Sequence, residues 1–92
     1  MRGVVKAKVD GNQTKIVEGL RKAGWLVRHT HIIGKGWPDL VAAKGALNLL
    51  VECKMPGEKL TPDELEFWQT WPGPKIIAFD PQDAIEKAEA LR

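Results

Sequence analysis

Ninety-two residues are enough for one compact domain, and a composition of 43% hydrophobic and 28% charged residues excludes an intrinsically disordered chain. A formal net charge of +2 is too small to identify a nucleic-acid-binding protein by itself. The single cysteine, Cys53, excludes an internal disulfide and fits a reducing compartment, and with only two histidines a structural zinc site is not expected.

The charges are unevenly distributed along the chain. Residues 1–46 carry nine Lys or Arg and three Asp or Glu, whereas residues 47–92 carry five and nine. The basic half would offer a surface to phosphates, although an uneven solvated surface would give the same pattern. No apolar run reaches the roughly 18 residues of a membrane span, and the N-terminus lacks the apolar core of a secretory signal. We therefore expect a cytoplasmic protein with no membrane partner.

The first predicted elements are an arm, a helix and a strand. Apolar residues alternate with lysines over residues 1–9, which indicates an N-terminal strand or arm. Residues 10–12 (Asp, Gly, Asn) offer capping side chains for a helix over about residues 13–24, which ends in glycine. Residues 25–33 are rich in β-branched and aromatic side chains and predict a strand.

A hairpin comes next in the chain. Residues 39–43 and 47–54 are predicted strands, and the connection through Lys44 and Gly45 is short enough only for an antiparallel pair.

The clearest local signal is a helix start at residues 61–64. Threonine as the cap, proline at the first helical position and glutamate three residues past the cap predict a helix to about residue 71. A buried strand over residues 75–79 should follow, and residues 80–83 repeat the cap pattern and predict a final helix.

This order of elements predicts a single α/β domain over residues 1–92. A helix, a three-stranded meander, a helix and a strand give an αβββαβ core with a mixed central sheet flanked by helices, followed by a C-terminal helix. The helix between the third and fourth strands permits a right-handed parallel crossover.

Two carboxylates and one lysine converge on the predicted hairpin. With the predicted turn, Asp39 would lie across from about Leu50, next to Glu52 on the neighbouring strand. Glu52 and Lys54 project to the same side, because strand side chains alternate between faces. Two carboxylates can hold a hard divalent cation such as Mg²⁺, and a nearby lysine can stabilise negative charge, which suits phosphodiester cleavage.

The same residue types also occur in ordinary structure. An Asp at a strand entrance and a Glu–Lys pair on a solvent-facing sheet edge would give this pattern without catalysis. Three details favour a site. A rigid Gly-Trp-Pro turn directly precedes Asp39, the strand that ends in Glu52 and Lys54 is strongly apolar and hence central, and a glycine-containing loop with a capped helix follows it.

These motifs resemble those of the VRR-NUC nucleases. The matching runs are Gly34-Lys35-Gly36-Trp37-Pro38-Asp39-Leu40, Leu50-Val51-Glu52-Cys53-Lys54 and Leu60-Thr61-Pro62-Asp63-Glu64. The resemblance extends over roughly residues 10–90 and implies the restriction-endonuclease-like fold of the P-D…(D/E)-x-K superfamily. It also implies a metal-dependent endonuclease that uses Mg²⁺, for which Mn²⁺ can substitute. Minimal members resemble homodimeric resolvases of branched DNA, such as Holliday junctions, and are often encoded by phages, so the implied setting is a bacterial or phage-infected cytoplasm.

The resemblance assigns roles to four residues of the hairpin. Asp39 and Glu52 would be metal ligands and Lys54 the catalytic lysine. The backbone carbonyl of Cys53 would be an additional ligand, so its thiol need not act.

Two positions depart from the family pattern. Gln13 stands where many members carry an acidic residue on the first helix, and its amide would hold metal-bound water rather than add charge. Glu64 stands where a glutamine is frequent, and it serves either the site or only the helix cap.

The candidates for DNA contact are Lys15, Lys35 and Trp37. Lys15 belongs to the basic half, and Lys35 would contact phosphate from its glycine loop. Trp37 would either stack on a base or pack at a dimer seam. His31 would either approach the site or be an ordinary strand histidine.

Three functions are compatible with these observations. The first is a homodimeric, structure-selective endonuclease, in which a two-fold dimer would match the two scission points of a junction. The second is a non-catalytic DNA-binding domain of the same fold, and the third is a nicking or restriction-type nuclease that a partner protein targets. Four tryptophans also exceed what one small core readily buries, which would leave some for an interface.

Overall fold

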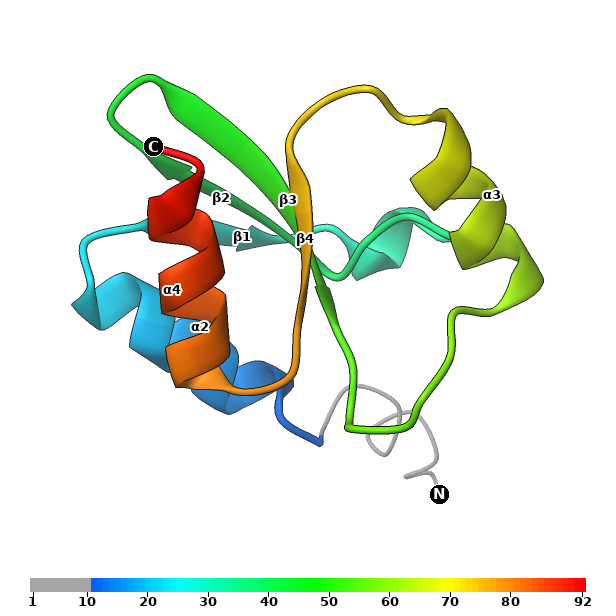
Figure 1. The fold of residues 1–92 in the computed structure, drawn as a ribbon, viewed down its shortest axis with the longest axis horizontal. Helices are drawn as coiled ribbons and strands as arrows, with labels where there is room; N and C mark the ends of the chain where they lie inside the picture. The colour runs from blue at the N-terminus through cyan, green and yellow to red at the C-terminus, as the bar shows by residue number, and fades with distance from the viewer. Residues whose placement is uncertain (1–10) are drawn as a thin grey trace.

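The computed structural model describes residues 11–92, which form three α-helices and one four-stranded sheet (Figure 1). The elements in chain order are α2 (Gln13–Lys22), β1 (Leu26–His29), the 3-10 helix η1 (His31–Ile33), β2 (Leu40–Lys44), β3 (Leu47–Cys53), α3 (Pro62–Thr70), β4 (Lys75–Ala78) and α4 (Pro81–Ala90). The predicted α/β class and the order of its helices and strands are confirmed. The strand or arm predicted over residues 1–9 lies outside the described residues.

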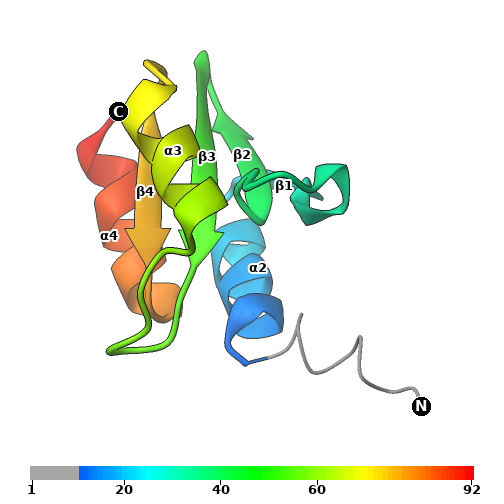
Figure 2. The same ribbon diagram turned by 90° about the vertical axis from the view of Figure 1, so that its right-hand side faces the viewer.

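The sheet is mixed, in the order β1-β2-β3-β4. Two antiparallel pairings are followed by a parallel pairing of β3 with β4, and α3 lies in the connection that the parallel pair requires. Helices α2 and α4 cover one face of the sheet, and α3 lies on the other side (Figures 1 and 2). Across residues 11–92, every helix is too short or too polar to cross a bilayer.

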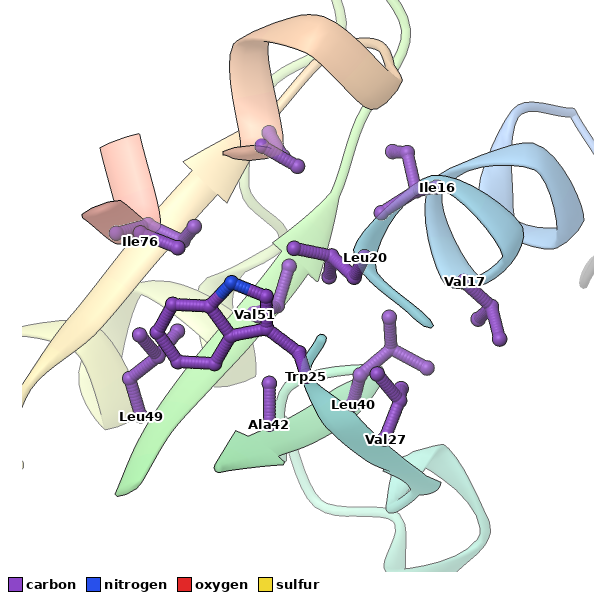
Figure 3. Close-up of a cluster of buried hydrophobic side chains, with 13 residues drawn as sticks. Ile16, Val17, Leu20, Trp25, Val27, Leu40, Ala42, Leu49, Val51 and Ile76 are labelled. Atoms are coloured by element: carbon purple, nitrogen blue, oxygen red, sulfur yellow. The ribbon is translucent and has the colours of Figure 1, made fainter. Parts of the chain in front are cut away.

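The hydrophobic core lies between the sheet and the layer of α2 and α4. Leu49 and Val51 of β3 are buried there with residues of α2, and the indole of Trp25 lies among them (Figure 3). Because side chains alternate along a strand, Leu50 and Glu52 point to the opposite face. The predicted arrangement, in which Glu52 projects away from an apolar face, is therefore confirmed.

Each tryptophan has a partner within the chain. Trp25 is buried in the core, and Trp37 and Trp71 pack with Phe67, with ring centroids 5.1 to 5.4 Å apart. Trp68 lies beneath a lysine ammonium that is 5.5 Å from its ring centroid. Of the four tryptophans only Trp25 is fully buried, so the core does not bury them all, and an interface that covers the others stays a prediction.

The strand predicted over residues 25–33 is too long. The N–H groups of Thr30 and His31 both donate to the Asp39 carbonyl, at 2.8 and 3.2 Å, and the chain turns into η1. Composition predicted continued strand, but these bonds to a residue nine and eight positions away decide the local conformation.

The hairpin turns one residue later than predicted, with Gly45 in the left-handed region at φ 61°. Leu40 pairs with Val51, so the register continued by one residue places Asp39 opposite Glu52 itself. The pairing differs from the predicted one by two residues, which leaves every side chain on its predicted face.

Asn12 precedes α2 but does not cap it with its side chain, so the capping role expected there is wrong. Its Nδ2 donates to the carbonyl of Lys54 at 2.9 Å and to that of Phe79 at 2.7 Å. The amide therefore ties the start of α2 to the ends of β3 and β4.

The two other predicted helix starts are confirmed. Thr61 Oγ1 accepts a bond from the Glu64 N–H at 3.2 Å, and Glu64 Oε1 accepts one from the Thr61 N–H at 2.9 Å, which completes a capping box. Asp80 Oδ1 accepts a bond from the Asp83 N–H at 2.8 Å at the start of α4.

We predict that Asn12→Ala lowers the free energy of unfolding by about 1–3 kcal/mol, because two part-buried carbonyls lose their donor. Urea denaturation would measure the change. The control is Gln82→Ala, which removes an exposed hydrogen bond and should change stability by no more than about 0.5 kcal/mol. Equal stabilities of the two variants would show that the tie is unimportant.

Candidate active site

The structure brings the two predicted carboxylates together. Asp39 directly precedes β2, and the register places it opposite Glu52 near the end of β3. Glu52 is only 3% exposed, although it is acidic and lies on a strand that pairs on both sides. Such burial is unusual for a carboxylate, and the cation beside it, the Lys54 ammonium, is 3.7 Å from Glu52 Oε2.

Pro38 ends the ladder between β2 and β3. The N–H groups of Leu50 and Lys54 donate to carbonyls on the β4 side of the sheet. Because these groups alternate in direction along a strand, the N–H and the carbonyl of Cys53 face β2. By register the partner of Cys53 would be Pro38, which has no N–H to donate. The Cys53 N–H donates instead to Asp39 Oδ2 at 2.8 Å. This bond fixes the Asp39 carboxylate, and Pro38 leaves the Cys53 carbonyl without a ladder donor.

Burial has the largest effect on the pKa of both carboxyl groups. Burial and the negative charges of Asp39 and Glu64 raise the pKa of Glu52 to about 8, against the opposing charge of Lys54. Burial also raises the pKa of Asp39, although the hydrogen bond from Cys53 acts in the opposite direction. Full ionisation of the pair would therefore place more negative charge here than its surroundings stabilise.

Lys54 places a buried ammonium beside the carboxylates. It is 6% exposed, and its Nζ lies 2.8 Å from Glu64 Oε1 and 3.7 Å from Glu52 Oε2. Burial alone would lower the pKa of Lys54, but its bond to Glu64 and the charges of Glu64 and Glu52 outweigh that effect and raise it. The lysine is therefore held as an ammonium in a fixed position.

Glu64 serves both of the roles that the sequence left open. The same oxygen, Oε1, accepts the capping bond from Thr61 and the bond from Lys54. Burial would raise the pKa of Glu64, but these two partners lower it below its ordinary value. The start of α3 is thus linked to the end of β3.

The loop before Asp39 touches the same helix. A Cβ at Gly36 would collide with the Asp63 carbonyl and the Glu64 nitrogen, and Gly36 has φ 80°. The backbones of the loop and of α3 are therefore in direct contact, with no side chain between them.

The residues present fit a hard divalent cation. Among residues 11–92, no three His, Cys, Asp or Glu side chains gather closely enough to form a metal site by themselves. Asp39 and Glu52 would therefore supply the charged oxygens, and the Cys53 carbonyl a neutral one. The remaining positions would be left to water, which Mg²⁺ commonly retains. The observation that supports this fit is geometric, because the register places Asp39 opposite the buried Glu52, beside a Cys53 carbonyl that lacks a ladder donor. Burial raises the pKa of both carboxyls, and a cation would stabilise their charged forms.

The thiol of Cys53 takes no part in this arrangement. Its side chain packs against the core on the opposite face from Glu52, and burial raises its pKa well above the ordinary value. A thiol that stays protonated is a poor nucleophile and a poor metal ligand.

Gln13 is buried, as its helix position predicts, and its amide contacts a histidine. Its Nε2 lies 3.3 Å from Nδ1 of His29 at the end of β1. The structure therefore gives Gln13 a partner outside the carboxylate pair. Asn12, its neighbour, does reach the site through the Lys54 carbonyl, and sequence reasoning missed it because asparagine before a helix usually caps.

The predicted DNA contacts lie in different surroundings. Lys15 is exposed on α2, and Lys35 is exposed with φ 52° in the glycine loop. Lys35 shares a hollow of about 470 Å³ with Asp63 and Glu66 of α3. Trp37 is half-buried against Phe67 and Trp71, so stacking on a base would require it to leave that cluster.

His31 is exposed on η1 rather than on a strand. Its charge acts to lower the pKa of Asp39, which places it within electrostatic range of the site.

Neither protein-family models, nor curated proteins, nor solved structures compared with this chain match it.

The pKa of Glu52 predicts that the protein without metal loses stability as the pH rises. A carboxyl whose folded pKa is raised contributes stability fully below its ordinary value of 4.5, and the contribution is lost as the pH passes about 8. One pKa unit corresponds to about 1.4 kcal/mol, so we expect a loss on the order of a few kcal/mol between about pH 5 and pH 8. Urea denaturation in EDTA would measure it.

Glu52→Gln is the matched variant, because an amide does not titrate, and its stability should be nearly constant over this range. The lowered pKa of Glu64 acts in the opposite sense, but below its ordinary value of 4.5 and therefore outside the range. A wild-type stability that is constant or rises from pH 5 to pH 8 would contradict the buried carboxylate pair.

Proposed function

We propose that this chain is a Mg²⁺-dependent DNA endonuclease of the VRR-NUC kind, with a restriction-endonuclease-like core. The observation that carries the proposal is the convergence of the half-buried Asp39 with the buried Glu52 and Lys54 at neighbouring strands. Buried ionisable groups weaken a small sheet unless they are paired or liganded, and here the negative charge exceeds the positive. The αβββαβ order is consistent with the proposed core.

In this proposal Asp39, Glu52 and the Cys53 carbonyl hold the cation, and Mn²⁺ can replace Mg²⁺. When bound, the cation supplies Lewis-acid activation of the scissile phosphodiester. The Cys53 N–H orients one carboxylate through its 2.8 Å bond to Asp39, so that its other oxygen is left for the cation.

Lys54 acts on the transition state rather than on binding. Its ammonium donates hydrogen bonds to the phosphoryl oxygens as negative charge develops on them. The bond to Glu64 holds the side chain in place before substrate arrives, so little reorganisation is needed. Glu64 is accordingly a positioning residue.

Branched DNA is the proposed substrate and a homodimer the proposed form, in the cytoplasm of a bacterium or a phage-infected host. Lys15 and Lys35 are placed to contact phosphates, which position DNA but do not specify sequence, so selectivity would come from DNA shape. An apolar hollow of about 480 Å³ beside the hairpin supports association of two copies. It is lined by Val41, Ala46, Leu47, Asn48, Leu49, Leu50, Trp71, Gly73 and Pro74.

We predict that Asp39→Asn and Glu52→Gln each weaken Mn²⁺ binding at least tenfold, because each removes a charged ligand. Isothermal titration calorimetry would measure the affinity. Cys53→Ser is the control, since its backbone carbonyl is unchanged, and it should bind Mn²⁺ as the wild type does. Wild-type affinity in both carboxylate variants would remove the metal site from this position.

Lys54→Ala should lower the rate of DNA cleavage about 10²- to 10³-fold while DNA affinity stays nearly unchanged, because the ammonium acts on the transition state. The matched control is Lys59→Ala, which removes an exposed lysine from the following loop. Cleavage would be measured with Mg²⁺ and with EDTA. Near-normal turnover by Lys54→Ala rejects its catalytic role, and a wild type that binds DNA but never cuts supports the non-catalytic alternative.

The protein should be a dimer at micromolar concentration and should cut a four-way junction faster than linear duplex of the same sequence. Light scattering would give the mass, and a panel of duplex, single-stranded, flap and junction DNA would give the preference. Binding to all of them should weaken with salt, while the preference for the junction should persist. A monomer that cuts junction and duplex equally would favour the nuclease that a partner protein targets.

A further inference from the structure

Two adjacent isoleucines project from the molecule next to the site. Ile32 is 82% exposed and Ile33 is 52% exposed, and Ile32 is the most exposed large hydrophobic residue of residues 11–92. Both belong to η1, which extends past the β1 edge of the sheet (Figure 2). We call this pair the isoleucine tip. Single exposed apolar side chains are common, but an adjacent pair on a projecting turn indicates a contact with something outside the chain.

The isoleucine tip is fixed relative to Asp39. The two N–H groups just before Ile32 donate to the Asp39 carbonyl at 2.8 and 3.2 Å, and Thr30 Oγ1 donates to the Pro38 carbonyl at 2.8 Å. The Ile33 N–H closes the turn by donating to Thr30 at 3.0 Å. The tip therefore reaches a substrate at a fixed place relative to the proposed metal ligand.

The segment of the chain that leads through the tip is rich in cations. Residues 19–38 contain four Lys or Arg, two His and no Asp or Glu. None of those four cations, Arg21, Lys22, Arg28 and Lys35, forms an ion pair with residues 11–92. Arg21 and Lys22 end α2 before β1 begins, whereas the tip follows the end of β1, so these two cations lie away from the tip. Arg28 of β1 and Lys35 of the glycine loop are the exposed cations next to the tip in the chain, and Lys35 shares its hollow with two acids of α3. A polyanion with apolar surface is the ligand that complements this combination.

We propose that the isoleucine tip packs against unstacked bases at the branch point of DNA, while Arg28 and Lys35 on either side of it in the chain contact the flanking phosphates. The proposal rests on DNA as the substrate of the proposed function. Proteins that distort DNA commonly insert aliphatic side chains at a base step, and unstacking is least unfavourable where stacking is already interrupted. The tip would then select branched over linear DNA and set its position relative to Asp39.

Two other partners, a second copy of the chain and an anionic membrane, fit the tip less well than DNA does. A second copy that met tip to tip would bring Arg28 and Lys35 of the two copies toward each other, which opposes association. An anionic membrane would match the charge, but two side chains on a three-residue turn bury far less apolar area than an interfacial amphipathic helix does.

The test is DNA binding in EDTA, where no cleavage occurs, with a four-way junction and a linear duplex that each carry 2-aminopurine at the same position. Ile32→Ser combined with Ile33→Ser should bind the junction about tenfold more weakly and bind the duplex as the wild type does. The rise in 2-aminopurine fluorescence that wild type causes at the branch should be lost. The matched control is Leu91→Ser, which removes a 45% exposed aliphatic side chain at the end of α4 and should behave as wild type.

Several outcomes would contradict the proposed contact between the tip and unstacked bases. An unchanged preference for the junction, or an equal loss for junction and duplex, means that it does not contact unstacked bases. A lower mass of the double variant in light scattering assigns the tip to a dimer interface. Loss of binding to phosphatidylglycerol–phosphatidylcholine vesicles, with DNA binding unchanged, assigns it to a membrane.

Cleavage of the junction by wild type in Mg²⁺, measured in parallel, tests the endonuclease separately. Tip-dependent binding without any cleavage would support the tip and overturn the catalytic proposal. Cleavage by wild type, with DNA binding unaffected by the double substitution, would support the endonuclease and contradict the proposed role of the tip.

Discussion

A single residue, Lys54, bonds to three elements of this protein through its backbone and its buried ammonium. Lys54 donates its N–H to Ala78 at the end of β4, accepts a bond from Asn12 at the start of α2, and extends its side chain to Glu64 on α3. A charge removed from water is destabilising by several kcal/mol unless its partners stay in place. The ammonium therefore holds α3 on one face of the sheet, while the backbone of the same residue is bonded to β4 and to the start of α2 on the other face. Glu52 lies beside this ammonium, at 3.7 Å.

A comparison of Glu52 with Glu64 shows why only Glu52 has carboxylate oxygens that are available to a cation. Burial acts in the same direction on both, yet the pKa of Glu52 is raised and that of Glu64 is lowered. Glu64 accepts bonds from Lys54 and from the Thr61 N–H, whereas Glu52 has the Lys54 ammonium only at 3.7 Å. Hydrogen-bond partners thus outweigh burial at one carboxylate and are insufficient at the other.

The sequence predicted those features that depend on local rules. The capping box at Thr61, the parallel fourth strand and the face shared by Glu52 and Lys54 each follow from spacing within a few residues or from element order. The features that it missed depend on distant partners. The amide of Asn12 serves carbonyls 42 and 67 residues away instead of its own helix. The chain leaves β1 at Thr30 because the acceptor is Asp39, and no local propensity contains that information.

The direct backbone contact at Gly36 couples the loop before Asp39 to α3, which limits how this region can be redesigned. The loop that leads to Asp39 rests on the first turn of α3, and that turn anchors Lys54 through Glu64. A substitution that adds a side chain at Gly36 pushes the helix outward and lengthens the contact that holds the lysine. The glycine loop and α3 therefore form one structural unit, and a design that transfers the loop to another protein has to transfer the helix as well.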